Sequence, residues 1–391
     1  MTAPFGRLER EPFALRRLGV IMQPDRSNPA EVEGVLNPAV TRGPDGQLYL
    51  FPRLVGAGNY SRIGKARVLF DPAGNPCNVE RMGIALEPEE PYEKNDETGG
   101  GCEDPRIVYL EPLQAYVMTY TAYGPEGPRI ALAVSSDLDR WQRLGLVRFG
   151  ETAPVNFNNV YNKDAVLFPQ MIPDPSGRAA VGLIHRPLFP GSQPHEVLQE
   201  LEEMRRQARS EEGSEEESSD SRRQRVHHES IWISYSQHPS SVDDLRLLHA
   251  HHRLMSPRYS WERIKVGAGA PPLLTRHGWL LVYHGVSGIL DDEKKRLRYS
   301  AGALVLDGQH PDVIRYRSRR PILVPDMNER DGIVPNVVFP SGLDQRTDLG
   351  DPDRVDVYYG MADDRIGVAT LRIPAELPEM EEQPEERRDA A

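Results

Sequence analysis

Short apolar segments recur along the chain in a three-part unit that occurs five times. The first part is a turn that enters an apolar segment, as in residues 103–108. The second part is an apolar run that ends in polar groups, as in residues 279–284, and the third alternates small and apolar residues, as in residues 129–133. Alternation with a period of two predicts β-strands. The five units begin at residues 37, 103, 163, 269 and 335.

A repeat of about 60–65 residues with three or four short strands is typical of stacked or radial arrays of sheets. One such unit is too small to bury its own apolar face, and radial closure leaves only short, protected edges. The sequence therefore predicts an all-β fold, a five-bladed β-propeller. We expect a single domain over residues 29–374, because the repeats fill that range. Residues 1–28 are expected to form an N-terminal arm, which is a candidate contact for a second copy of the chain.

The spacing between the third and fourth units is longer than the others, which indicates an insertion at residues 194–229 in the third blade. Its first half, residues 195–209, has apolar residues on one face of a predicted short helix. Its second half, residues 210–221, is rich in serine and glutamate, a composition typical of disorder. The insertion is either a solvated loop or a lid or oligomer contact near the site. Residues 375–391 form an acidic tail that we expect to be disordered.

The net charge of −12 is concentrated in two segments. Residues 196–220 carry −7 and residues 376–389 carry −5, so the repeats are close to neutral, which argues against a nucleic-acid partner. No apolar stretch is long enough to cross a membrane, and the N-terminus lacks the apolar core of a signal peptide. The two cysteines, Cys77 and Cys102, do not make a disulfide framework. We therefore expect a cytoplasmic protein.

Polar residues occupy equivalent places in the repeats, where they would converge on the axis of a propeller. Asn and Asp are also common turn residues, so a structural role at each turn is the alternative. The turns before the first strands carry Asn37, Asp104, Asp164, Gly269 and Asn336, and the second strands end near Arg53, Tyr120, Arg186, His284 and Asp363. The histidines show no spacing typical of a metal site, and we predict neither a metal nor an organic cofactor.

Asp104 is the leading candidate for a catalytic acid. Glycines at positions 99–101 allow the backbone to approach a ligand closely, and Pro105 restricts Asp104 to an extended backbone. Arg106 can hold a neighbouring carboxylate. A carboxyl group in a partly dry funnel can keep a proton and act as a general acid. The alternative interpretation is a salt-bridged turn.

A second candidate group is cationic, and it consists of Lys163, Arg186, Lys265 and His284. Positive groups directed at one axis suit an anion, because arginine offers a planar fork to phosphate oxygens and lysine a point charge. In the alternative interpretation, each cation pairs with a carboxylate of its own.

Several motifs, in this order along the chain, resemble those of glycoside hydrolase family 130, which contains the β-mannoside phosphorylases and is built on a five-bladed propeller. The resemblance covers the chain from about Pro29 to Pro374 outside the insertion. The motifs lie at residues 37–39, 101–107, 162–169, 184–187, 265–272, 283–286 and 359–363.

The resemblance implies an inverting phosphorolysis of a β-mannosidic bond, with inorganic phosphate as co-substrate and α-mannose 1-phosphate as product. Asp104 matches the catalytic acid, which in some members acts through the 3-hydroxyl of the sugar. Arg186 and His284 match phosphate-binding positions, and Lys163 lies where many members have a phosphate-binding arginine, which keeps the charge and loses the fork. The residues that would bind the sugar are Asn37, Arg53, Arg106, Asp164, Lys265 and Asp363.

The chemistry of the candidate residues agrees with phosphorolysis. An inverting hydrolase needs an acid and a separate base, whereas a phosphorylase needs one acid and a cationic cradle. A β-mannoside hydrolase on the same scaffold, or a sugar-binding propeller without activity, is the alternative. The sequence does not distinguish a β-1,4 from a β-1,2 linkage, nor does it identify the acceptor sugar.

Overall fold

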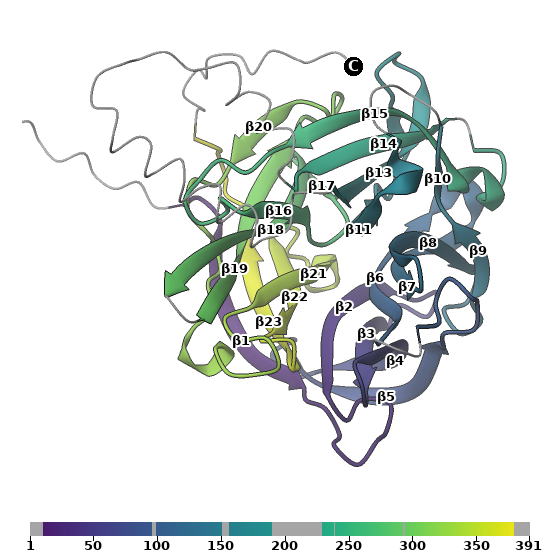
Figure 1. The fold of residues 1–391 in the computed structure, drawn as a ribbon. Helices are drawn as coiled ribbons and strands as arrows, with labels where there is room; N and C mark the ends of the chain where they lie inside the picture. The colour runs from purple at the N-terminus through teal and green to yellow at the C-terminus, as the bar shows by residue number, and fades with distance from the viewer. Residues whose placement is uncertain are drawn as a thin grey trace, which may run out of the picture.

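The computed structural model describes residues 11–95, 99–150, 156–189, 229–237, 239–291 and 294–378 (Figure 1). Regular structure in these residues consists of β-strands and short 3-10 helices, so the all-β prediction is confirmed. The helix and the disorder predicted for residues 195–221, and most of the acidic tail, lie outside the described residues. No helix in the described ranges is long and apolar enough to span a membrane.

The first two repeats each form a four-stranded antiparallel unit. A short parallel pairing of β4 with β6, at Tyr60–Gly100 and Ser61–Gly101, joins them into one eight-stranded sheet. The strands of the first unit are β2 (Gly34–Arg42), β3 (Leu48–Gly56), β4 (Tyr60–Phe70) and β5 (Pro76–Leu86). Those of the second unit are β6 (Gly100–Leu110), β7 (Ala115–Gly124), β8 (Gly127–Ser135) and β9 (Gln142–Leu146).

The remaining repeats form three separate sheets. The third unit contains β10 (Arg148–Phe149), β11 (Tyr161–Leu167), β12 (Ile172–Pro173), β13 (Ala179–Leu188), β14 (Ile231–Gln237) and β15 (Leu247–Met255). The fourth contains β16 (Lys265–Ala268), β17 (Leu273–Thr275), β18 (Gly278–Asp291), β19 (Lys294–Leu306) and β20 (Ile314–Arg317). The fifth contains β21 (Val338–Gln345), β22 (Arg354–Met361) and β23 (Arg365–Arg372). The 3-10 helices are η1 (Glu111–Leu113), η2 (Phe157–Asn159), η4 (Val242–Arg246), η5 (Met327–Glu329) and η6 (Thr347–Leu349).

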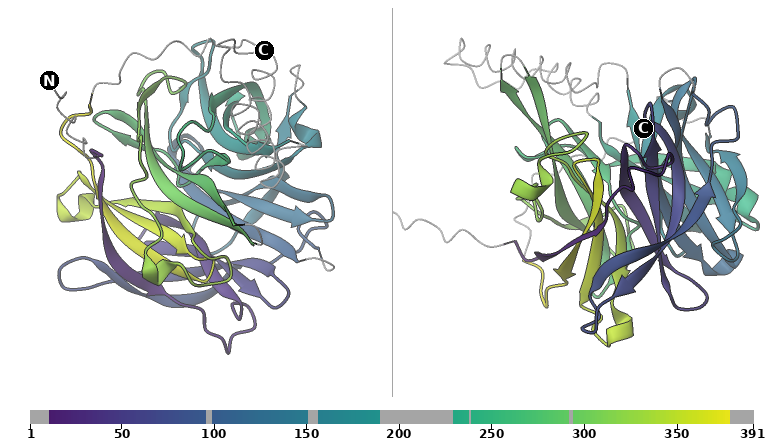
Figure 2. Two further views of the ribbon diagram at one scale, coloured as in Figure 1. Left: turned by 60° about the vertical axis from the view of Figure 1, so that its left-hand side comes forward. Right: turned by 90° about the horizontal axis from the view of Figure 1, so that it is seen from below.

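The N-terminal segment differs from the arm that the sequence predicts. Residues Ala14–Met22 form β1, which pairs antiparallel with β23 and completes the fifth unit (Figures 1 and 2). Phe13 is buried against the fourth and fifth units, and Ile21 and Met22 are buried against the first. Phe13, Ile21 and Met22 are therefore packed within the molecule, and β1 covers the edge of β23.

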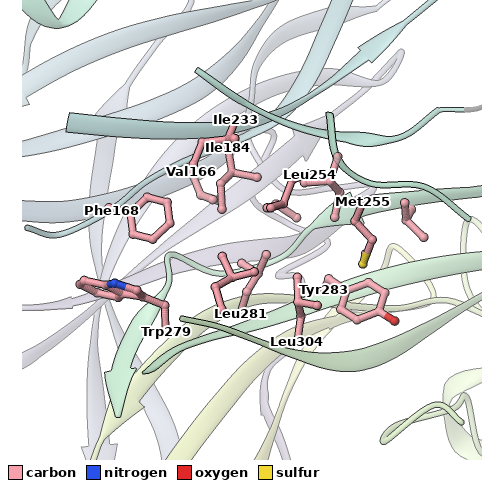
Figure 3. Packing of buried hydrophobic residues seen from close by; sticks show 14 of the residues in the cluster. Val166, Phe168, Ile184, Ile233, Leu254, Met255, Trp279, Leu281, Tyr283 and Leu304 are labelled. Atoms are coloured by element: carbon pink, nitrogen blue, oxygen red, sulfur yellow. The ribbon is translucent and has the colours of Figure 1, made fainter. Parts of the chain in front are cut away.

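Apolar cores lie between successive units. The core between the third and fourth units packs Val166, Phe168 and Ile184 against Trp279 and Leu281 (Figure 3). Equivalent cores join the first unit to the second, the second to the third, and the fourth to the fifth. A further core joins the fifth unit back to the first, and β2 also contacts both β6 and β21. Each unit thus buries both of its apolar faces against its neighbours.

Three buried glutamates hold the turns that precede the first strands of their units; we call them the clamp glutamates. Each carboxylate accepts a hydrogen bond from at least one backbone N–H of its own turn. It also accepts from a tyrosine hydroxyl on β7, β18 or β22 and from an arginine on β9, β20 or β1, which are the second and the outermost strands of their units. The three sets are Glu93 with Tyr120 and Arg143, Glu262 with Tyr283 and Arg317, and Glu329 with Tyr359 and Arg17. Arg17 of β1 occupies the place of Arg143 and Arg317, so β1 acts as the fourth strand of its unit.

Candidate active site

The turn residues of the repeats share an unusual backbone conformation. Asn37, Asp104, Asp164 and Asn336 have positive φ angles of 43°, 48°, 55° and 62°, a region that non-glycine residues rarely adopt and that concentrates at functional sites. In β2, β6 and β11 this residue lies in a break of the strand register, and such bulges re-aim side chains. The expectation that Pro105 keeps Asp104 extended is therefore wrong, since the bulge outweighs the local preference.

Gly269 occupies the same place in the fourth unit. A Cβ atom there would lie 2.3 Å from the carbonyl oxygen of Val282 and 2.6 Å from that of Pro340, so no side chain fits. The carbonyl oxygen of Gly269 instead accepts a hydrogen bond from Nε of Arg106.

Asp104 lies in a group of charged side chains, the Asp104 cluster, formed by Asn37, Arg53, Glu103, Asp104 and Lys163. Asn37 Nδ2 donates to Asp104 Oδ1 over 2.9 Å, and Arg53 Nη1 lies 3.4 Å from the same oxygen. Glu103 bridges two cations, at 2.9 Å from Arg53 Nη2 and 3.3 Å from Lys163 Nζ. Glu103 is almost fully buried, with 2% of its surface exposed. The Glu103 carboxylate therefore holds the positive groups of Arg53 and Lys163 near Asp104.

Arg106 does not hold a carboxylate, contrary to the expectation from the sequence. Its Nη1 donates to the carbonyl oxygens of Asp104 and Pro105 at 3.0 Å each, and so fixes the bulge. Burial lowers the pKa of this guanidinium. Its Nη2 is buried and has no hydrogen-bond partner among the described residues, so a donor is available there.

A second group of buried side chains, the Arg186 cluster, consists of Asp164, Arg186, Glu229, Lys265 and His284. Arg186 Nε donates to Asp164 Oδ2 over 2.6 Å, and its Nη1 forms an ion pair with Glu229. Lys265 Nζ lies 3.7 Å from the same Glu229 oxygen, and His284 Nε2 lies 3.5 Å from Asp164 Oδ2. Neither ring nitrogen of His284 has a hydrogen-bond partner in the part of the chain that the structure describes.

The pKa values of Asp104 and Asp363 are shifted in opposite directions. Burial opposes the ionisation of Asp104, but the charges of Arg53, Arg106 and Lys163 outweigh it and lower the pKa of Asp104. Burial, together with the negative charges of Asp104 and Glu103, raises the pKa of Asp363 to about 7. The carboxyl group that is still partly protonated at pH 7 is therefore Asp363, whereas we expected it to be Asp104.

The Arg186 cluster combines an ionised carboxyl group with a neutral histidine. Burial opposes the ionisation of Asp164, but the charge of Arg186 and its hydrogen bond hold the pKa of Asp164 well below the ordinary range. Burial, aided by the charges of Arg186 and Lys265, lowers the pKa of His284 to about 3. His284 is therefore a neutral donor and acceptor at pH 7, and the positive charge of the cluster comes from Arg186 and Lys265.

Comparison with known proteins gives the family. The family model described as beta-1,4-mannooligosaccharide phosphorylase, of glycoside hydrolase family 130, matches residues 7–181 and 222–380. The chain belongs to glycoside hydrolase family 130. It is 29% identical over 362 residues to a 1,2-beta-oligomannan phosphorylase of Thermoanaerobacter sp. (strain X514), a match that covers 90% of this chain and 95% of the relative. A beta-1,2-mannobiose phosphorylase of the same organism is 31% identical over 276 residues, which cover 69% of this chain and 67% of the relative.

A solved family-130 structure supports the fold alone, because its identity is low. The beta-1,2-mannobiose phosphorylase from Listeria innocua, in complex with beta-1,2-mannobiose, superposes with a TM-score of 0.63 at 21% identity. The superposition covers 92% of this chain and 96% of that one.

Two residues of this family-130 site were missing from the sequence prediction. Glu103 was noted only as part of a motif, and Glu229 was assigned to the insertion. The structure instead places Glu229 against the fourth unit, where it forms an isolated parallel bridge with Lys265 and its carbonyl oxygen accepts from the backbone N–H of Val266 over 3.1 Å.

The repeat contains a signal that would have identified Glu229. His185 pairs with Trp232 in antiparallel strands, so Arg186 lies opposite Ile231, and Glu229 precedes Ile231 by two residues. Ser61 stands in the same relation to Arg53 and accepts a hydrogen bond from its Nε over 2.9 Å. Tyr299 stands in that relation to His284, and their rings lie 5.9 Å apart. This diagonal position therefore faces the polar end of the second strand in three units.

Asp363 lies on the turn between β22 and β23, and its carbonyl oxygen would be 2.9 Å from a Cβ atom on Gly34 of β2. The charges of Arg53, Glu103, Asp104 and Lys163 act on its carboxyl group, so Asp363 belongs beside the Asp104 cluster. Within the described ranges, no group of three or more His, Cys, Asp or Glu residues could hold a metal ion. The arrangement can accordingly bind a hydroxylated ligand beside Asp104 and an anion beside Arg186.

Proposed function

We propose that the protein is an inverting glycoside phosphorylase that cleaves a β-mannosidic bond with inorganic phosphate and releases α-mannose 1-phosphate. The observation that carries this proposal is that two chemically different clusters lie next to each other. Lys163 of the Asp104 cluster is adjacent in β11 to Asp164 of the Arg186 cluster, and it pairs in register with Arg186. Family membership and the phosphorylase names of the relatives support it.

In the proposed reaction a phosphate oxygen attacks the anomeric carbon from the Arg186 cluster while the departing oxygen takes a proton on the opposite side. The bond from carbon to the departing oxygen breaks, the carbon–phosphate oxygen bond forms, and the configuration inverts. Arg186 and Lys265 neutralise the anion, and His284 donates one N–H to it. Asn37, Arg53 and Asp363 would position the sugar, and the role assigned to Asp104 is that of the proton donor.

The ionised state of Asp104 in the free protein requires that it gains a proton in the complex. Cations keep this carboxyl ionised, and a bound phosphate dianion offsets their charge and so raises its pKa. Asp363, with a pKa of about 7, is a protonated carboxyl close enough to feel the charge of Asp104. We infer that the proton reaches the leaving oxygen from this carboxyl pair, with Asp104 as the final donor.

We also propose that the five units close into a five-bladed β-propeller. The core between the fifth and first units, and the contact of β2 with β21, support this closure. Closure would bring the first strands, and with them both clusters, around one axis.

The assay that tests the function supplies β-1,2- and β-1,4-mannobiose with and without phosphate. We expect turnover only with phosphate, with α-mannose 1-phosphate detected by phosphorus and proton NMR. The two substrates also decide the linkage. Release of free mannose at the same rate without phosphate would reject phosphorolysis.

Hydrolysis is the second candidate, and one observation favours it. Glu229 is a second buried carboxylate on the side of the proposed nucleophile, and an inverting hydrolase needs such a base to activate water. The phosphate-free arm of the assay measures this activity directly.

A further inference from the structure

Glu229 has an unusual position for a carboxylate in a site that would bind an anion. It is 1% exposed, and its Oε2 contacts both Arg186 Nη1 and, at 3.7 Å, Lys265 Nζ. The backbone of Glu229 is held against β16 through its bridge with Lys265 and the hydrogen bond from Val266. The backbone of Glu229 is therefore fixed beside β16, and its buried carboxylate lies at both cations.

An oxyanion that pairs with Arg186 and Lys265 must consequently lie beside this carboxylate. A carboxylate can only accept hydrogen bonds, and two negative oxygens in contact at a buried site repel each other strongly. The repulsion turns into attraction when the bound anion carries a proton, because its hydroxyl group then donates to the carboxylate. Hydrogen phosphate and hydrogen arsenate carry such a proton at neutral pH, and sulfate does not.

We propose that Glu229 accepts a hydrogen bond from the hydroxyl group of the bound oxyanion and so makes the Arg186 cluster selective for proton-bearing oxyanions over sulfate. The proposal rests on the proposed function only in assuming that this cluster binds an oxyanion. Repulsion between the Glu229 carboxylate and sulfate would exclude sulfate, and such repulsive contacts are a common source of specificity.

Direct binding tests this selectivity without turnover. Isothermal titration of the full-length protein at pH 7.5 and constant ionic strength, with phosphate, arsenate and sulfate as separate ligands, should give similar affinities for phosphate and arsenate. Sulfate should bind about tenfold more weakly or worse, as expected for one like-charged contact. Equal affinities for phosphate and sulfate in the unmodified protein would overturn the proposal, and this measurement requires no variant.

The variant Glu229→Gln keeps the shape of the side chain and removes its charge. We expect it to bind sulfate about tenfold more tightly than the unmodified protein and to bring the phosphate-to-sulfate ratio within about threefold. Glu111→Gln, an exposed change on η1, is the matched control and should leave the ratio unchanged. Arg186→Ala should lose both ligands, which shows that the titrated site is the Arg186 cluster.

The outcomes separate this inference from the proposed function. A folded Glu229→Gln protein that keeps the original ratio would refute the role of Glu229 even if the protein phosphorolyses mannosides. Conversely, strong discrimination against sulfate in a protein that fails to cleave any mannoside would support the oxyanion site and reject the proposed reaction.

Discussion

Glu262 and Glu229 are both almost fully buried and both pair with an arginine, yet their surroundings differ. Glu262 accepts from a tyrosine hydroxyl, from Arg317 and from two backbone N–H groups, so its hydrogen-bonding capacity is used. Glu229 pairs with two cations and receives no tyrosine or turn contact of that kind in the described residues. The hydrogen-bonding capacity of Glu262 is thus used within the fold. In the Arg186 cluster the two cations face the carboxylates of Asp164 and Glu229, and the ring nitrogens of His284 remain without a hydrogen-bond partner in the described residues.

This contrast helps to identify a site within a repetitive fold. Repeated elements place buried charges in every unit, so burial alone does not indicate function. Buried polar atoms without a hydrogen-bond partner occur in several parts of the described chain, for example at Trp279 Nε1 and Tyr358 OH, so they do not by themselves identify a site. Asn37 Oδ1, Arg106 Nη2 and both nitrogens of His284 differ in that they lie in or beside the two charged clusters, where a polar ligand could supply the missing partners.

The largest expected effect is on the chemistry of the Asp104 cluster. Asp104→Asn keeps the hydrogen-bonding shape and removes the proton donor, so kcat for mannoside cleavage should fall by about 1,000-fold. The midpoint of urea unfolding should hardly change, which separates this residue from the clamps. Activity close to that of the unmodified protein would show that Asp104 is not the acid.

A clamp variant should show the reverse behaviour. Glu262→Gln leaves Arg317 buried without its carboxylate, which should lower the free energy of unfolding by about 3 kcal/mol. The kcat of the protein that remains folded should not change. Tyr283→Phe, which removes only the hydroxyl group, provides the graded control at about 1 kcal/mol. Urea denaturation measures the free energy of unfolding of both variants, and initial rates on the same samples measure kcat. A large loss of kcat in either variant would contradict a purely structural role for the clamp glutamates.

Arg186→Ala should affect phosphate binding and leave sugar binding nearly unchanged. Loss of the guanidinium should raise KM for phosphate by about 100-fold, as for one charge-assisted contact, while KM for the mannoside changes less than about threefold. Initial rates with each substrate varied in turn measure the two constants. An equal rise in both would mean that Arg186 also serves the sugar.

The smallest predicted effect concerns stability and pH. The pKa of Asp363 is raised from 3.8 to about 7 in the folded protein, so the unfolded chain loses this proton first and stability falls as pH rises from about 4 to about 7. Asp363→Asn removes that cost and should raise the free energy of unfolding by about 1–2 kcal/mol at pH 8, with little effect at pH 4. Denaturant unfolding at both pH values tests the sign; a gain that is larger at pH 4 would contradict it.

The strands and the polar turns were predictable because they depend on local pattern. All fifteen segments of the repeat contain or adjoin strands of the structure, and Asn37, Asp104, Asp164 and Asn336 share one backbone conformation. The errors concern interactions between distant parts of the chain. The protonation of Asp104 depends on Arg53 and Lys163, and the place of β1 depends on an edge that only β23 supplies. Glu229 was missed because residues 194–229 were assigned to the insertion, which excluded this position from the repeat.

The pairing of β1 with β23 has a consequence for biosynthesis. β1 precedes every other strand of the described fold in the sequence, and its partner β23 (Arg365–Arg372) follows every other strand. Asn37 in the first unit and Asp363 in the fifth are likewise far apart in the sequence. During synthesis the chain therefore holds an unpaired β1, and every proposed sugar-binding residue except Asp363, before the fifth unit is made. Pairing between strands this far apart in the sequence slows folding, and the proposed site would be completed only when β23 pairs with β1.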